Sequence, residues 1–186
     1  MPETDSLQLV QRCIAQDEEA CGEFLDLYKN QIFTFVLRMA GDPADAEDIA
    51  QETFVKAFTH LESYNPEYPL ITWLFKIAHN TCLDHLRARK PQALSIDDED
   101  APIDVADSAA GPDTMTEWKL QAEDTERLLA SLPPLYREAL LLQYRDELTC
   151  REIAEIVQAP EGTVKIRLSR AKAMLREKME RLAVAA

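Results

Sequence analysis

The chain has 186 residues, with 20 Lys and Arg against 34 Asp and Glu, which gives a net charge of −14. Its 46% of hydrophobic residues is enough to build a core, so disorder over the whole length is excluded. No apolar run approaches the ~18 residues of a membrane span, and the N-terminus shows no basic-then-apolar signal pattern. We therefore expect a soluble, cytoplasmic protein. The chain has only four glycines, and this low number favours helices over turn-rich β-structure.

The composition changes sharply at Pro91. Residues 91–117 hold eight acidic residues and three prolines but no basic residue, and they show no sustained hydrophobic period. Such a segment buries too little apolar surface to offset the entropy of ordering it. Both flanking regions have a helical pattern instead. The sequence thus predicts an all-α protein in which two small helical domains, 1–90 and 118–186, are joined by an acidic flexible linker at 91–117.

Hydrophobic periodicity in the first domain predicts helices near 6–16, 18–40, 43–62 and 70–89, with a loop at 63–69. Asp42 followed by Pro43 is typical of an N-cap and a first-turn proline. The predicted buried face of helix 43–62 consists of Ala46, Ile49, Ala50, Phe54, Ala57, Phe58 and Leu61.

The opposite face of helix 43–62 is acidic. It carries Asp45, Asp48 and Glu52, with Gln51 and Val55 beside them. An acidic stripe can be no more than a solvated surface. An exposed valine among carboxylates instead favours a docking surface for a basic partner.

Helix 70–89 also has two different faces. The predicted buried face consists of Ile71, Leu74, Phe75, Ala78, Cys82 and Leu86. The other face carries Trp73, Lys76, Asn80, Leu83 and Arg87, next to a loop with Tyr64, Asn65 and Tyr68. Aromatic, amide and basic groups together can bind unstacked bases and phosphate. The alternative is that the tryptophan only packs and the cations only solubilise the helix.

The second domain is predicted to contain helices near 114–131, 133–145, 149–157 and 160–181. Thr149 and Glu152 form a capping-box pattern, and Gln158-Ala159 is a tight connection between the last two helices. On helix 160–181, a narrow stripe of Val164, Leu168, Ala171 and Leu175 is predicted to be buried.

Burial of that stripe turns a basic surface outward. This surface consists of Ile166, Ser169, Arg170 and Ala173, flanked by Lys165, Arg167, Lys172 and Arg176. A helix-turn-helix places such a second helix in the DNA major groove, where arginine reads guanine and flanking cations neutralise phosphate. An exposed isoleucine there fits contact with a thymine methyl or with a masking protein. The alternative is an ordinary amphipathic helix that closes a bundle.

Three motifs occur together in this order: 45–54, 72–87, and the pair 132–139 with 152–171. They resemble, respectively, the polymerase-binding helix, the promoter-melting helix and the fourth-domain helices of bacterial extracytoplasmic-function (group IV) RNA polymerase sigma factors. The resemblance implies a transcription initiation factor that binds core polymerase and recognises −10 and −35 promoter elements. It also implies an anti-sigma partner, and Gln158 stands where the family often has a turn glycine.

The resemblance implies a role for each matching residue. Core polymerase, through the clamp helices of its largest subunit, would bind Asp45, Asp48, Gln51, Glu52 and Val55. The −10 element would bind Tyr64, Asn65, Tyr68, Trp73, Lys76, Asn80, Arg87, Arg89 and Lys90. The −35 element would bind Arg151, Thr163, Lys165, Ile166, Arg167, Ser169 and Arg170, while the flap of the second-largest subunit is a further implied contact. Because the chain is acidic, we expect weak promoter binding without polymerase.

Two other classes of function compete with this interpretation. A helix-turn-helix regulator would bind its operator as a dimer, without polymerase. An enzyme is disfavoured because no phosphate-binding glycine loop and no activated nucleophile is evident, and we expect no cofactor. His79, Cys82 and His85 resemble a metal motif, but the two histidines lie ~9 Å apart along a helix and roughly 120° apart around it. Cys82 and Cys150 are expected to project into cores, where thiols are inert.

Overall fold

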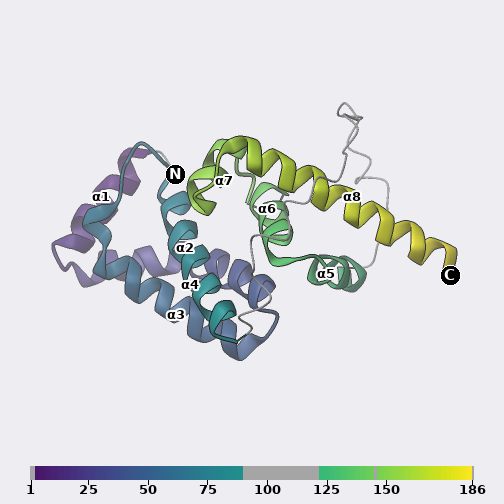
Figure 1. Cartoon of the computed structure of the whole chain (residues 1–186). Helices are drawn as coiled ribbons and strands as arrows, with labels where there is room; N and C mark the ends of the chain where they lie inside the picture. Colours follow the sequence, from purple (N-terminus) through teal and green to yellow (C-terminus); the bar gives the residue numbers. More distant parts are fainter. Residues whose placement is uncertain (1–2, 90–121, 145, 186) are drawn as a thin grey trace.

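The structure, a computed structural model, describes residues 3–89, 122–144 and 146–185. Within these ranges the chain forms eight α-helices, one 3-10 helix and no strand, which confirms the all-α prediction (Figure 1). The first helix group comprises α1 (Glu3–Ile14), α2 (Glu18–Ala40), α3 (Pro43–Thr59), η1 (Leu61–Ser63) and α4 (Leu70–Arg89). The second helix group comprises α5 (Ala122–Ala130), α6 (Pro134–Tyr144), α7 (Cys150–Val157) and α8 (Glu161–Ala185). The predicted linker at 91–117 and the predicted site residue Lys90 lie outside the described residues.

Helix bounds differ from the predicted ones where a cap intervenes. The first helix ends at Ile14 rather than at 16, because Gln16 adopts a left-handed backbone with φ +62°. Asp17 then caps α2, and its side chain accepts a hydrogen bond from the Ala20 backbone N–H at 3.1 Å. Helix α3 ends at Thr59 rather than at 62, because the chain tightens into a 3-10 turn there.

The last helix is longer than predicted. Helix α8 extends to Ala185, beyond the predicted end at 181. Helix α5 ends at Ala130, close to the predicted 131, and it is described from Ala122 onward. Figure 1 shows α8 as a long rod that projects away from the first helix group.

The first helix group is a small bundle in which α2, α3 and α4 pack on one another and α1 covers α2. Aromatic pairs fill its centre. The Phe24 and Phe58 rings lie 5.3 Å apart between their centroids, and those of Phe35 and Phe75 lie 5.1 Å apart. Offset and edge-on pairs of this kind are favourable beyond the area that they bury.

In the second helix group α6 and α7 both pack against α8, and α7 also packs against α4 of the first group (Figure 1). The apolar stripe predicted on the last helix is buried as expected. Buried apolar side chains of both groups form one connected cluster. The two helix groups are therefore in direct contact.

Some core predictions were wrong in degree. Phe58, Ile71, Leu86 and Cys150 are half-buried rather than buried. His79, which was not assigned to the core, is buried with 4% of its surface exposed. The reason is that the second helix group covers this side of α4, which the pattern of a single helix does not reveal.

Candidate protein and nucleic-acid interfaces

The acidic face of α3 starts from a well-made helix end. The Asp42 side chain accepts hydrogen bonds from the backbone N–H groups of Ala44 and Asp45, at 2.9 and 3.1 Å, and Pro43 occupies the first turn. Further along the helix Asp48 and Gln51 are exposed, and Val55 keeps 65% of its surface exposed. The predicted unburied valine is thus present among carboxylates.

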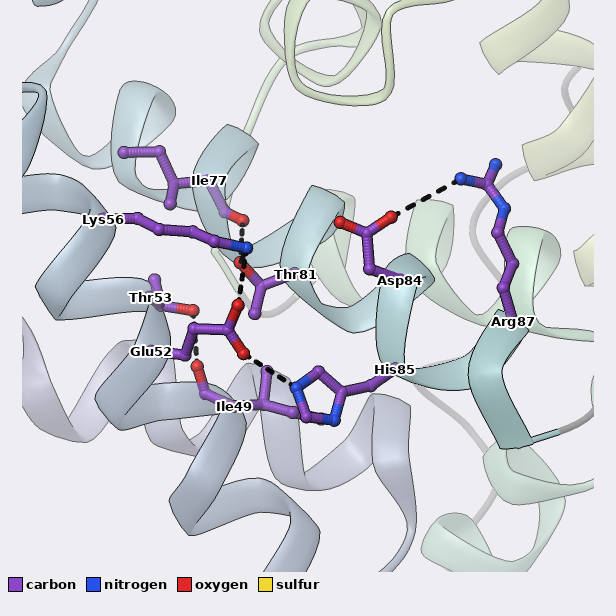
Figure 2. A network of polar contacts seen from close by, with 9 residues as sticks. All are labelled: Ile49, Glu52, Thr53, Lys56, Ile77, Thr81, Asp84, His85 and Arg87. Atoms are coloured by element: carbon purple, nitrogen blue, oxygen red, sulfur yellow. Dashed lines mark hydrogen bonds and ion pairs between the residues drawn. The ribbon is translucent and has the colours of Figure 1, made fainter.

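Two residues of this face are already engaged inside the protein. Glu52 is half-buried and lies 2.8 Å from both Lys56 Nζ and His85 Nε2, as Figure 2 shows. Asp45 is half-buried and forms an ion pair with Arg89. Hydrogen bonds from Lys56 and His85 hold the pKa of the Glu52 carboxyl below its usual range.

Hydroxyl and ammonium groups extend this network between α3 and α4 (Figure 2). Lys56 Nζ donates to Thr81 Oγ1 at 3.2 Å, and that hydroxyl donates to the Ile77 carbonyl at 2.9 Å. On the outer side of α4, Arg87 lies 3.7 Å from Asp84. The acidic face and the basic end of α4 are therefore joined by polar contacts.

The loop before α4 is held by its own side chains. Tyr64 Oη donates to the Tyr68 carbonyl at 2.9 Å, and Asn65 Oδ1 accepts from the Glu67 backbone N–H at 3.0 Å. The Trp73 ring meets Tyr64 edge-on, with 6.0 Å between the ring centroids. The predicted loop and Trp73 are thus brought together, with both ring systems half-buried and Asn65 exposed.

The remaining predicted residues of α4 differ in accessibility. Asn80, Arg87 and Arg89 are exposed. Lys76 is half-buried because its ammonium lies 2.6 Å from Glu155 of α7. Sequence reasoning did not identify Glu155, since no local pattern relates α7 to α4.

The α7–α8 pair has the local geometry that the sequence predicted. Thr149 Oγ1 accepts from the Glu152 backbone N–H at 3.3 Å, and the Thr149 N–H donates to the Glu152 carboxylate at 2.8 Å. Gln158 adopts the left-handed conformation, with φ 52° and ψ 41°, which glycine would adopt without strain. This tight connection sets α8 against α7.

The outward face of α8 is basic with an apolar centre. Ile166 keeps 52% of its surface exposed, and Lys165, Ser169 and Arg151 are exposed as well. Thr163 and Arg167 are half-buried. Arg170 differs from the outward position that was predicted: it is half-buried, and its Nη1 donates to Tyr136 Oη at 3.5 Å. Lys165, Ile166 and Ser169 are thus exposed together on the first turns of α8, while Arg151 is exposed on α7.

Sequence reasoning also missed a buried polar pair. His79 Nδ1 of α4 contacts the carboxylate of Glu138 of α6, and both side chains are almost fully buried. A signal was present for His79, because it lies at helical spacing from Phe75 and Cys82 on the buried face. Glu138 had none, since the contact that buries it comes from a distant segment.

The candidate metal motif and the thiols are placed as follows. His79 and His85 contact carboxylates on different helices, α6 and α3, and no metal-binding cluster is found among the described residues. Burial raises the pKa of the Cys82 thiol, and burial with neighbouring Cys21 raises that of Cys13 to about 12. No helix within the described ranges has the length and apolar character needed to cross a bilayer.

Comparisons with protein families, with related sequences and with solved structures all identify sigma factors. Residues 24–92 match the family Sigma-70 region 2, and residues 122–175 match Sigma-70, region 4. The chain is 35% identical to the ECF RNA polymerase sigma factor SigW of Bacillus subtilis over 174 residues, which cover 89% of this chain and 92% of that one. It is 32% identical to the RNA polymerase sigma-H factor of Pseudomonas aeruginosa, covering 89% of each chain.

Two solved structures share the fold. The sigma factor RpoE, solved in complex with the anti-sigma factor NepR from Bartonella quintana, superposes with a TM-score of 0.65 and 26% identity. That match covers 86% of this chain and 96% of the other. CnrH, solved in complex with the cytosolic domain of CnrY, has the same TM-score at 21% identity, covering 92% and 95%, and shows the fold alone.

Proposed function

The chain belongs to the bacterial extracytoplasmic-function RNA polymerase sigma factors, and on this basis we propose which of its surfaces bind which partners. It is a transcription initiation factor that binds core RNA polymerase and directs promoter-specific initiation. Residues 1–90 are proposed as sigma domain two, 91–117 as the linker and 118–186 as sigma domain four. The chemistry of RNA synthesis is assigned to the polymerase, so the chain has no proposed catalytic residue, and its site of action is the cytoplasm.

Core polymerase is proposed to bind the acidic face of α3 through its largest subunit. Exposed Asp48 and Gln51 surround Val55, whose 65% exposure is unfavourable unless a partner covers it. A basic partner surface complements this face in charge and buries the valine at its centre. Asp45 and Glu52 lie at its margin, where each already has an internal partner.

The non-template strand of the −10 element is proposed to bind between the loop 64–69 and α4. Trp73 and Tyr64 offer aromatic rings that meet edge-on, on which an unstacked base can stack. Exposed Asn65 and Asn80 offer amide groups to base edges, and Arg87, Arg89 and Lys90 are the proposed contacts to duplex phosphates. Lys76 is proposed as the phosphate contact at the centre of this surface.

The −35 element is proposed to bind the outward face of α8. Lys165, Ile166 and Ser169 are exposed at the first turns of this helix, where a helix-turn-helix reads base edges. Arg167 and Arg170, both half-buried, are proposed to join them at the −35 element, and Arg151 and Thr163 are proposed to contact the DNA backbone. The flap of the second-largest polymerase subunit is the proposed protein contact of the same domain.

An anti-sigma factor is the third proposed partner. The RpoE structure, which shares the fold at 26% identity, is a complex with an anti-sigma factor. The exposed apolar residues of the two proposed interfaces, Val55 and Ile166, are suited to being masked in such a complex. Inhibition would then result from covering the surfaces that polymerase and promoter need.

One observation carries this proposal. Exposed Val55 lies in an acidic surface on the segment that matches sigma region 2, and exposed Ile166 lies in a basic surface on the segment that matches sigma region 4. Run-off transcription with core polymerase tests it. Asp48→Ala is expected to weaken core binding. Lys165→Ala is expected to change promoter choice and to leave core binding unchanged.

Matched controls are available on the same helices. Glu47→Ala on α3 and Arg181→Ala on α8 remove the same charges from exposed positions outside the proposed surfaces. An identical transcript profile for both test variants and both controls would refute the assigned roles.

A further inference from the structure

Two cysteines lie on either side of the tight connection between α1 and α2. Cys13 is next to the last residue of α1, and Cys21 lies one turn into α2. The backbone N–H groups of Gln16 and Asp17 reverse the chain between them, donating to the carbonyls of Cys13 and Arg12 at 3.0 and 3.1 Å. The end of α1 is therefore folded back against the start of α2.

Polar and apolar contacts fix the two helices in this arrangement. The Arg12 guanidinium of α1 lies 2.7 Å from Asp17, the cap of α2, and 3.6 Å from Glu23 within α2. On the inner side, Val10 of α1 and Phe24 of α2 are both buried in the same apolar cluster. Helix α1 thus packs on α2 over the stretch that carries both cysteines.

The two thiols are in contact with each other. Both are free, with Cys13 5% exposed and Cys21 half-buried. Burial raises the pKa of the Cys13 thiol, and the charge of Cys21 and a hydrogen bond with its thiol raise it further, to about 12. A disulfide needs sulfur atoms about 2 Å apart on side chains that point toward each other. Two hydrogen-bonded thiols reach that geometry by a small movement of their side chains.

The other two cysteines have neighbours of different kinds. Cys82 is 1% exposed in the core, where its neighbour is the carboxylate of Glu138. Cys150 is half-buried, and its sulfur accepts from Gln143 Nε2 at 3.9 Å. These two thiols are therefore internal controls for any reaction that depends on the contact between Cys13 and Cys21.

We propose that Cys13 and Cys21 are a reversible redox pair, which a peroxide oxidises to an intrachain disulfide that fastens α1 to α2. The thiolate of the more accessible Cys21 attacks one oxygen of hydrogen peroxide, the O–O bond breaks, and the leaving hydroxide takes up a proton to form water. The Cys13 sulfur then attacks the resulting sulfenic acid, loses its proton and expels the hydroxyl group as a second water. Two thiols and one peroxide thus give one disulfide and two waters.

This pair has the properties of a responsive bond rather than a permanent one. Disulfides of cytoplasmic proteins are usually transient, because cellular thiols reduce them by exchange. Helix α1 also contacts η1, the turn directly before the loop 64–69. The bond would hold this supporting helix in place under oxidising conditions. The inference does not depend on the proposed polymerase and promoter surfaces.

Peptide mapping of the full chain tests bond formation. The folded protein is treated with hydrogen peroxide, its free thiols are alkylated, and it is then digested with a glutamate-specific protease. Cleavage after Glu18 or Glu19 separates the two cysteines, so their peptides stay joined only if a disulfide links them. We expect joined peptides that dithiothreitol separates. Separate peptides with Cys21 alkylated, oxidised to sulfinic acid or linked to a second chain would overturn the proposal.

Variants and thermal unfolding complete the test. Cys21→Ser should abolish the joined peptides, whereas Cys150→Ser, the matched control, should retain them. Oxidation should raise the melting temperature of the wild type by about 5–10 °C, because a crosslink across a short loop restricts the unfolded chain. The same treatment should leave the melting temperature of Cys21→Ser unchanged. A wild type that shows no rise, or an equal rise in Cys21→Ser, would overturn the stabilising bond.

Discussion

Nε2 of His85 lies 2.8 Å from the carboxylate of Glu52, so the helix proposed for core polymerase and the helix proposed for promoter DNA are joined by a hydrogen bond. Lys56 holds the other oxygen of the same carboxylate at 2.8 Å. The acidic face of α3 therefore contains carboxylates of two kinds, one exposed at Asp48 and one already bound at Glu52. Their substitution should have different consequences.

The first prediction concerns the acid sensitivity of Glu52→Gln. Because the pKa of Glu52 is below its ordinary value of 4.5, the ionised form stabilises the fold above that pH, and the contribution is lost as pH falls through the lowered pKa. Glu52→Gln should lose up to about 1 kcal/mol at pH 7, since solvent screens a half-exposed pair. Urea unfolding of wild type and variant measures this difference, which should shrink on acidification. Glu47→Gln on the same helix is the control, and an equal loss in both would contradict the prediction.

The second prediction concerns Trp73. Its ring meets Tyr64 edge-on at 6.0 Å, and the proposed −10 site uses it to stack on an unpaired base. Trp73→Ala should weaken binding of a −10 non-template oligonucleotide to the holoenzyme by about 1–3 kcal/mol, while Trp73→Phe keeps most of the affinity. Fluorescence anisotropy gives both values. Equal affinity of Trp73→Ala and wild type would exclude stacking, and core binding serves as the control.

The third prediction separates the two faces of α8. Leu168 is 4% exposed, so Leu168→Ala should lower the free energy of unfolding by about 2–5 kcal/mol. Ile166→Ala should change stability by less than about 0.5 kcal/mol but should alter selection among −35 sequences, because an exposed isoleucine is suited to a thymine methyl. Urea unfolding and transcription from a promoter library measure the two effects. A stability loss at Ile166 as large as that at Leu168 would show that Ile166 belongs to the core.

The fourth prediction concerns the turn at Gln158. Its left-handed backbone is strained for a residue with a side chain and free for glycine. Gln158→Gly should raise the free energy of unfolding by up to about 1 kcal/mol, because relief of strain exceeds the entropy that glycine adds to the unfolded chain. Gln158→Ala keeps the Cβ and should show no gain. Thermal unfolding of the three proteins checks the order, and a destabilised glycine variant would contradict it.

Local features were predictable because they depend on residues close together in the chain. The Thr149–Glu152 capping box, the Asp42 cap before Pro43 and the buried stripe that contains Leu168 all follow from spacing within one or two turns. Helix ends were less exact. The left-handed Gln16 terminates α1 early, and nothing in its side chain requires that conformation.

The sequence by itself determined an all-helical chain with an acidic face on α3 and a basic, partly apolar face on α8, since periodicity and charge are properties of each helix alone. Only the tertiary structure decided that Glu155 holds Lys76, that His79 is buried against Glu138 and that Glu52 is shared by Lys56 and His85. Apart from the Glu52–Lys56 pair within α3, these contacts join residues 33 to 79 positions apart. Their partners depend on how whole helices pack, and helical periodicity carries no information about packing across such distances.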